Sequence, residues 1–296
     1  MSGGLAEVVA ALGGDLWDGG LRASVPAPGH SRKDRSVSLR LVDDRLLIHT
    51  FGDGDWRSVR DDLLRRGLIT ADGRIGAVAP SRPTLSPATR ELAAARLWSR
   101  LAPLRSDEPA SRHLRRRAVT ADPTSLTALR GGSAPLSVYA EAGRQRPVLA
   151  AAITISGRLT GLELTYLHAD GRRASDLRLP RKTVGVLPPG CAVDLSGAAA
   201  TRLVVGEGVF TVLSAMARFD RPGFAALAAH NLARWRPPFE ARDVLIAADP
   251  GRVGEAAATA LADRLAPAGV RVRIALPEPG YEDWNAEAMA AAGVRP

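Results

Sequence analysis

The sequence predicts a multidomain chain with α+β regions followed by a C-terminal α/β domain on a mostly parallel sheet. Three observations predict this fold class. Two alternating apolar and polar segments lie near the N-terminus, a β-rich stretch fills the middle, and short apolar runs alternate with helix-like segments at the end. The length of 296 residues and a hydrophobic content of 46% are ample for more than one core.

The first region, residues 1–78, is predicted to be a small β region with flanking helices. The alternating segments 36–42 and 45–51 are typical of a hairpin. Residues 55–69 have apolar positions at helical spacing, and Gly67 stands near their end. We expect side chains on the hairpin and the start of this helix to hold the region together: Leu39, Leu41, Leu47, Phe51 and Trp56.

The second region, residues 79–134, is predicted to be a linker and a helical arm. Its beginning is rich in Pro and Ser, and the stretch 88–104 then carries apolar residues at helical spacing. A basic cluster follows, which could run along a phosphate backbone, with a solvated helix face as the alternative. Its members are Arg112, Arg115, Arg116 and Arg117.

The third region, residues 135–200, is predicted to be β-rich. Apolar and polar residues alternate across two turns, at 156–157 and 169–171, which indicates antiparallel strands. The single cysteine, Cys191, can form no internal disulfide and no cysteine-based zinc site.

The fourth region, residues 201–296, places acids after apolar runs. Glu207 and Asp249 each follow a predicted strand, and Asp283 follows the last one. Because ligands of parallel sheets bind outside the carboxyl ends of the strands, these acids could converge on a magnesium ion. A helix start for Glu207 and a turn for Asp249 remain open as alternatives. His230 and Asn231 also follow an apolar run and could lie near Glu207.

The charge balance favours a polyanionic partner. There are 40 basic and 31 acidic residues, a formal net charge of +9, and lysine occurs only twice. Arginine binds phosphate bidentately, so nucleic acid is the expected partner, although a coding bias explains part of the preference for arginine. No apolar run reaches the roughly 20 residues of a membrane span, and no secretory signal is evident, so we expect a cytoplasmic protein without a membrane partner.

Three segments of the fourth region, in this order and separation, resemble the Toprim domain of bacterial-type primases, topoisomerases and related nucleases. They are VVGEGVFTVLSA, VLIAADPGRVGEAAATALADRL and PEPGYEDWNAE. The resemblance implies a Rossmann-like domain in which a Glu and an Asp-x-Asp end two strands and bind magnesium. It assigns catalysis to Glu207 and Asp249, and Mg²⁺ or Mn²⁺ binding to these two residues with Asp283. Among these proteins, the segments resemble the primases of phages and plasmids.

Residues 26–69 are similar to the zinc ribbon of such primases, but the zinc ligands are missing. His30 remains, whereas other residues stand where cysteines would be expected: Val25, Ala27, Thr50 and Gly54. A structural zinc takes four ligands, so we expect a ribbon-like fold without zinc.

The acidic motif also departs from the family pattern. Gly251 stands where the second Asp would be, and Ala286 replaces an acid that often follows Asn285. Losing a carboxylate removes charge needed by a second cation, which puts two-metal catalysis in doubt. Glu255 could replace the missing acid, although a helix-start role is favoured.

Two functions follow, and whether the chain is an enzyme stays open. The first is a primase-like replication protein of a mobile element that uses nucleotides and a single-stranded DNA template, with Arg252 positioning the strand. The alternative is a catalytically degenerate DNA-binding module that docks on a replicative helicase. A small-molecule phosphate-binding protein is a third, weaker possibility, because the phosphate-loop pattern is absent.

Overall fold

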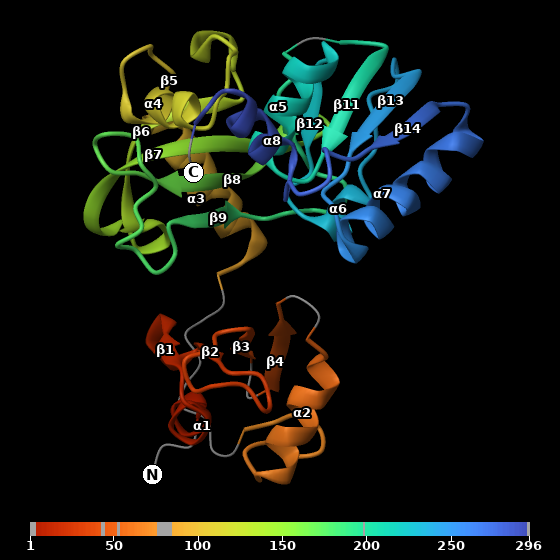
Figure 1. Ribbon diagram of the computed structural model, residues 1–296. Coiled ribbons are helices and arrows are strands. Elements are labelled where there is room, and N and C mark those ends of the chain that lie inside the picture. Colours follow the sequence, from red (N-terminus) through yellow and green to blue (C-terminus); the bar gives the residue numbers. More distant parts are fainter. Residues whose placement is uncertain (1–3, 43–44, 52–53, 76–84, 198, 295–296) are drawn as a thin grey trace. The chain divides into compact units, whose positions relative to one another are not determined.

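The computed structural model describes residues 4–42, 45–51, 54–75, 85–197 and 199–294, and the chain divides into two compact units, residues 1–84 and 85–296 (Figure 1). The boundary expected between residues 78 and 79 lies outside the described residues.

The N-terminal unit is built on a four-stranded antiparallel sheet in the order β1-β2-β3-β4. Its elements are α1 (Leu5–Leu12), β1 (Asp15–Trp17), the 3₁₀ turn η1 (Asp18–Gly20), β2 (Arg22–Val25), β3 (Val37–Val42), β4 (Arg45–Thr50) and α2 (Trp56–Arg65). The expected hairpin is β3 and β4, in which Val37 pairs with Thr50. Helices and sheet share one core, which includes Leu5, Leu39 and Leu63.

Three of the five side chains expected to hold this unit are exposed. Leu47, Phe51 and Trp56 are exposed, whereas Leu39 is fully buried. Side chains alternate between the two faces of a strand, and on β4 the core takes Leu46, so its neighbour Leu47 points outward. The expectation was therefore wrong for these three side chains, which lie outside the core of the unit.

A carboxylate holds the loop where a zinc ribbon would place its first ligands. The Asp34 carboxylate accepts hydrogen bonds from the backbone N–H of Ala27 at 3.0 Å and from both the hydroxyl and the N–H of Ser36, and it lies 3.1 Å from His30 Nδ1. These bonds, the Ser36 hydroxyl first, lower the pKa of Asp34 to about 2. His30 is therefore tied to an acid of its own loop.

The second unit begins with a five-stranded antiparallel sheet in the order β5-β6-β7-β8-β9. Its strands and helices are α3 (Pro87–Arg100), β5 (Ala102–Pro103), α4 (Pro109–Arg116), β6 (Leu129–Ser137), β7 (Ala142–Ile155), β8 (Arg158–Tyr166) and β9 (Arg181–Gly185), with 3₁₀ turns η2 (Pro123–Ser125) and η3 (Val138–Ala140). The predicted turn at Ser156 and Gly157 joins β7 to β8, and both residues have positive φ, as a tight hairpin requires.

A second five-stranded sheet completes this unit, in the order β10-β12-β11-β13-β14. Only β10 is antiparallel to its neighbour. The elements are β10 (Val193–Asp194), β11 (Arg202–Gly206), α5 (Val209–Phe219), β12 (Gly223–Ala225), α6 (Ala229–Leu232), β13 (Asp243–Ala247), α7 (Arg252–Leu265), η4 (Ala266–Ala268), β14 (Arg271–Ala275) and α8 (Trp284–Ala291). The expected mostly parallel sheet and the β-rich region before it are both confirmed.

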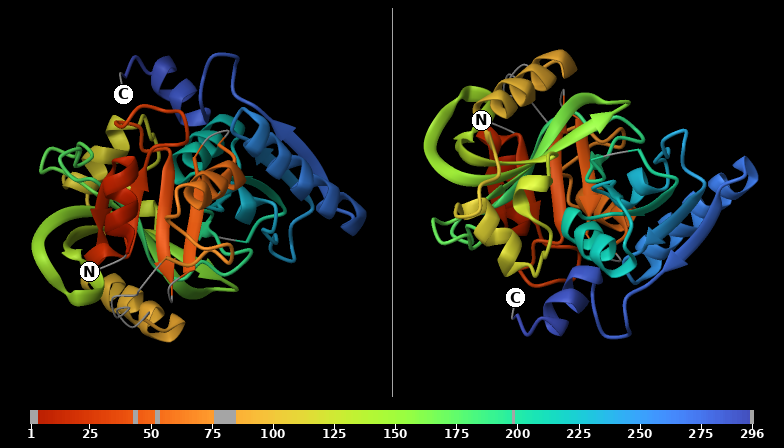
Figure 2. Two further views of the ribbon diagram at one scale, coloured as in Figure 1. Left: turned by 90° about the horizontal axis from the view of Figure 1, so that it is seen from below. Right: turned by 90° about the horizontal axis from the view of Figure 1, so that it is seen from above.

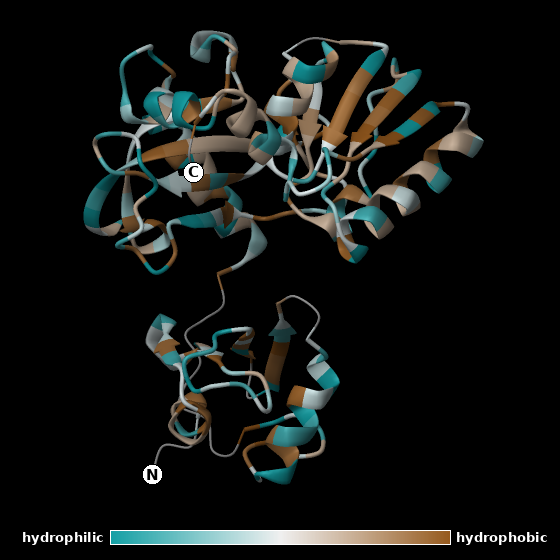
Figure 3. Ribbon diagram, viewed as in Figure 1, coloured by the Kyte–Doolittle hydropathy of each residue, from teal (hydrophilic) through white to brown (hydrophobic). Residues whose placement is uncertain are grey.

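Helices cover both faces of the parallel sheet. On β11, Val204 packs with α5 and α8, whereas Leu203 and Val205 pack with α6 and α7. Figure 1 shows α5 beside α8, Figure 2 shows α7 along β14, and Figure 3 shows β11 and β13 as mainly apolar after a hydrophilic first residue. A parallel sheet buried on both faces needs such strands. Within the described part of the chain, none of the helices combines the length and apolar character that a membrane span needs.

Candidate active site

Adjacent parallel strands bring the first two acids to one edge of the sheet. Gly206 at the end of β11 pairs with Ala247 at the end of β13, so Glu207 and Asp249 leave the sheet side by side. The first turn of α7 packs closely on this edge, because a Cβ at Gly254 would lie 2.3 Å from the Asp249 carbonyl oxygen. Glycine is required there.

The third acid is placed by a helix cap. The Asp283 Oδ1 accepts a hydrogen bond of 2.6 Å from the backbone N–H of Ala286 and so begins α8. Its charge is near enough to Asp249 to raise the pKa of that residue. The structure thus brings the three predicted metal ligands into one electrostatic neighbourhood.

The Asp249 carboxyl is held in an unfavourable environment for a negative charge. Burial first, and then the charges of Glu207 and Asp283, raise its pKa to about 7, although a hydrogen bond from Thr211 acts in the other direction. Its buried Oδ1 has no hydrogen-bond partner among the described residues. Burial also raises the pKa of Glu207, and a hydrogen bond from the Ala229 N–H opposes that shift.

These features fit a divalent cation. A buried carboxylate oxygen without a partner, next to two further carboxylates, lacks a positive charge that a hard cation would supply. The described residues contain no group of three or more His, Cys, Asp or Glu side chains arranged to hold a metal ion. Mg²⁺ bound together with substrate phosphates usually takes only one or two protein carboxylates.

One arginine of the predicted basic cluster faces the acids. The Arg117 guanidinium lies 5.0 Å from the centre of the Phe210 ring, in the first turn of α5. Burial lowers its pKa, and the charge of Asp283 raises it again. Its Nε is buried without a hydrogen-bond partner in the described structure. Arg117, at the end of α4, thus places a half-buried cation within electrostatic range of Asp283.

The other three arginines of the cluster are bonded to neighbouring turns. Arg112 binds Asp107 and the Ala169 carbonyl, Arg115 binds the Ser106 carbonyl, and Arg116 binds the Asp170 carbonyl. These contacts brace α4 and leave part of each side chain exposed. Arg252 is the first residue of α7 and is exposed near the strand ends.

The sequence comparisons agree with the geometry of the acids. The family model of the Toprim domain matches residues 202–292, which contain the whole parallel part of the second sheet and α8. Residues 202–292 are a Toprim domain. A family described as a domain of unknown function, DUF7146, matches residues 88–195, and no curated protein matches the chain.

Two solved structures are similar in fold at low sequence identity. The zinc-binding and RNA polymerase domains of the Aquifex aeolicus primase are 16% identical, with a TM-score of 0.45, over 98% of this chain and 80% of that one. The primase fragment of the bacteriophage T7 primase-helicase protein is 18% identical, with a TM-score of 0.39, over 60% of this chain and 68% of that one.

Glu255 does not replace the missing second acid of the Toprim domain. The Glu255 Oε1 accepts a 2.9 Å hydrogen bond from the backbone N–H of Gly251, so its carboxylate serves the start of α7. A Cβ built at Gly251 would meet no atom within 4 Å, but φ there is +105°, which strains any side chain. The place of the second acid is open.

Polar side chains near the acids mainly hold the Toprim domain together. Asn231 is buried and binds the Gly190 N–H and the carbonyls of Cys191 and Ala226, so it fixes a loop. His230 lies close enough to lower the pKa of Glu207.

Sequence reasoning missed two groups near the acids. Arg181, the first residue of β9, lowers the pKa of Glu207, and Thr211 donates a hydrogen bond to Asp249. The position of Thr211, four residues after Glu207 in the following helix, was a usable signal. Arg181 had none, because it comes from a different sheet.

Proposed function

We propose that the chain is a primase-like DNA replication protein of a phage or plasmid element, acting in the cytoplasm. It would join nucleotides on a single-stranded DNA template by nucleotidyl transfer that depends on Mg²⁺ or Mn²⁺. The observation that carries the proposal is the half-buried Asp249 carboxylate, near Glu207 and Asp283, whose buried Oδ1 has no partner in the described residues. Its position in a Toprim domain supports a role in phosphoryl transfer.

The acids would have distinct roles. Glu207 and Asp249 would hold the cation, with Asp283 adding negative charge, and the bound cation would neutralise charge that develops on the transferred phosphate. Alternatively, Glu207 would accept a proton from the attacking hydroxyl, because its raised pKa brings it toward neutral pH.

The arginines would hold the substrate. Arg117 at the end of α4 and Arg181 at the start of β9 lie within electrostatic range of Asp283 and Glu207, so they would bind phosphates of template or nucleotide. Stacking on Phe210 fixes the Arg117 guanidinium before substrate arrives, which reduces the ordering needed on binding. Arg252 would contact the strand at the edge of the site.

A second candidate function is favoured by Gly251. Without the second acid, the Toprim domain would bind DNA and dock on a replicative helicase without catalysing synthesis. The absence of the zinc-ligand pattern from the N-terminal sequence points the same way. The two functions share the DNA partner and differ in the role of the carboxylates.

Primer synthesis on a single-stranded DNA template, with Mg²⁺ or Mn²⁺, separates the two. We expect Glu207→Gln and Asp249→Asn to lower synthesis by about 10²–10³-fold, the effect of removing one group that stabilises the transition state. DNA binding, measured in parallel, should survive both changes. Glu255→Gln is the matched control, because it makes the same change in a carboxylate that caps α7 and should leave synthesis intact.

The outcome distinguishes the proposals. If purified protein binds DNA but makes no product, and the acid variants bind equally well, the accessory function replaces the enzymatic one. If Glu255→Gln lowers synthesis as much as Asp249→Asn, the assignment of the acids is wrong.

A further inference from the structure

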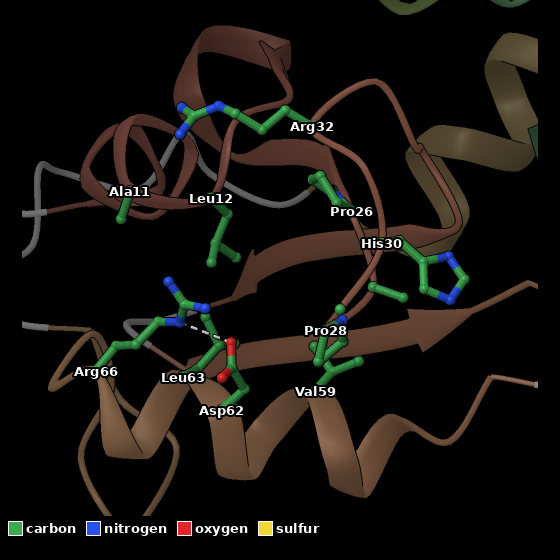
Figure 4. Close-up of a pocket in the computed structure, with 12 residues that line it drawn as sticks. Ala11, Leu12, Pro26, Pro28, His30, Arg32, Val59, Asp62, Leu63 and Arg66 are labelled. Atoms are coloured by element: carbon green, nitrogen blue, oxygen red, sulfur yellow. Dashed lines mark hydrogen bonds and ion pairs between the residues drawn. The ribbon is translucent and has the colours of Figure 1, made fainter.

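A cavity in the N-terminal unit has walls of two kinds. It has a volume of about 190 Å³ and lies between the end of α1, the loop of residues 26–32 and one side of α2 (Figure 4). A single water molecule occupies about 30 Å³, so the cavity is more than a packing void. Pockets for drug-sized ligands start at about 300 Å³, so this one suits a small ligand or one unit of a polymer.

One part of the wall is apolar and rigid. Two proline rings and branched side chains line it: Leu12, Pro26, Pro28, Val59 and Leu63. Proline rings cannot rotate away, so they keep a surface on which a planar ring can pack and bury apolar area.

The other part of the wall is basic. The Arg66 Nε donates a hydrogen bond of 2.7 Å to the Asp62 carboxylate, and a terminal nitrogen of Arg65 donates one of 2.9 Å to the same carboxylate. Arg65 and Arg66 thus share the single negative charge of Asp62. In the part of the chain that the structure describes, the Arg32 guanidinium has no hydrogen-bond or ion-pair partner.

The two arginines of the cavity lie at the same end of it. Figure 4 shows the guanidinium groups of Arg32 and Arg66 at the α1 end, on either side of Leu12, and the His30 ring at the opposite end. Guanidinium groups that approach from two sides suit the several oxygens of a phosphate. The apolar wall then receives what the phosphate is attached to.

We propose that this cavity binds a nucleotide, with its phosphate between Arg32 and Arg66 and its base against Pro26, Pro28 and Leu63. The nucleotide is either a free nucleoside monophosphate or the terminal nucleotide of a DNA strand, since both present the same chemistry. The site lies in the N-terminal unit and does not depend on the function proposed for the Toprim acids.

Calorimetric titration of the full chain without divalent metal tests this proposal. The probes are adenosine monophosphate, adenosine, ribose 5-phosphate and a short 5′-phosphorylated oligonucleotide. We expect the monophosphate to bind and Arg32→Gln to weaken binding by about tenfold to a hundredfold, as for the loss of a charged hydrogen bond. Adenosine and ribose 5-phosphate should each bind more weakly than the monophosphate.

Arg65→Gln is the matched control. It removes the same charge from α2 and also contacts Asp62, but Arg65 does not line the cavity. Binding should persist in this variant.

Three results would overturn the proposal: no nucleotide binds, Arg32→Gln binds as tightly as the unchanged chain, or ribose 5-phosphate matches adenosine monophosphate. In the first two cases the arginines serve only the negative end of α1. Comparison of the monophosphate with the oligonucleotide identifies the source of the nucleotide.

Discussion

Two aspartates of this molecule stand in opposite environments. Asp34 in the N-terminal unit receives hydrogen bonds from Ala27 and Ser36, and its pKa is lowered to about 2. Asp249 in the Toprim domain is half-buried near two other acids, has a buried oxygen without a partner among the described residues, and has a pKa raised to about 7. The Asp34 carboxylate has its hydrogen-bond partners within the protein, whereas the Asp249 carboxylate lacks a partner that a bound cation would supply.

The difference shows how a structural and a chemical role can be told apart. A loop that needs only to be held in place can satisfy its carboxylate internally, as at Asp34. A site that binds a cation must keep its acids incompletely paired, at a cost in stability. The three predictions below test this contrast, from the largest expected effect to the smallest.

The pH dependence of stability should reveal the strain at Asp249. In the absence of metal, its pKa is raised from 3.8 to about 7, so the folded chain binds the proton first and stability rises as pH falls from 7 to 3.8. Burial lowers the pKa of His113 from 6.5 to about 4, so the stability that neutral His113 supplies is lost as pH falls from 6.5 to 4. The shift corresponds to roughly 4 kcal/mol for Asp249 and to roughly 3 kcal/mol for His113.

The two effects oppose each other in the unchanged protein. Asp249→Asn removes one of them, so this variant should lose about 3 kcal/mol more than the unchanged chain between pH 6.5 and 4, measured by urea unfolding. Equal losses in both proteins would show that Asp249 is not strained. Adding His113→Gln to the variant should cancel the extra loss.

Restoring the missing acid should strengthen metal binding at the Toprim site and lower the stability of the chain. Gly251→Asp adds a carboxylate into open space, but at a φ of +105°. We expect a stability loss of about 1–3 kcal/mol from the backbone, together with tighter Mn²⁺ binding by calorimetry. Gly269→Asp, at a left-handed φ of +80° and also in open space, is the control that should lose less stability and gain no metal affinity. Equal metal affinity in the two variants would refute the role of this position.

The smallest effect is expected at Asp34. Asp34→Asn keeps one acceptor oxygen and loses the other, so hydrogen exchange should quicken in the loop around Ala27 while residues 85–296 stay unchanged. Stability that depends on Asp34 should be present above pH 3.8 and lost as pH falls toward 2. Asp61→Asn on α2 is the exposed control. A change in exchange on adding a zinc chelator would contradict a ribbon held by this carboxylate.

Much of the Toprim site could be predicted from the sequence because strand ends are local features. Apolar runs of buried parallel strands stop where the chain turns, and Glu207 and Asp249 follow those stops directly. Parallel topology then requires both acids to lie at one edge. The hairpin of β3 and β4 was predictable for the same reason, since alternation is visible in the residues themselves.

Directions of side chains could not be predicted in the same way. The run of arginines on α4 looked uniform, yet Arg117 alone turns to the acids, because the helix ends at Arg116 and Ala118 takes a φ of +53°. A helix end and a positive φ in alanine leave little trace in the sequence. Arg181 reaches the site from another sheet, which local patterns cannot show.

One buried amide has a consequence for how this chain can change in evolution. The Asn285 Nδ2 donates to the Arg117 carbonyl at 2.7 Å and to the Ser214 hydroxyl at 2.9 Å, and so joins α8 to α5 and to the end of α4. Recombination that exchanged residues 202–292 for a Toprim domain lacking this amide would leave the Arg117 carbonyl without that donor and release the end of α4. Residues 88–195 and 202–292 therefore depend on each other through this contact. A functional hybrid must carry both sides of it.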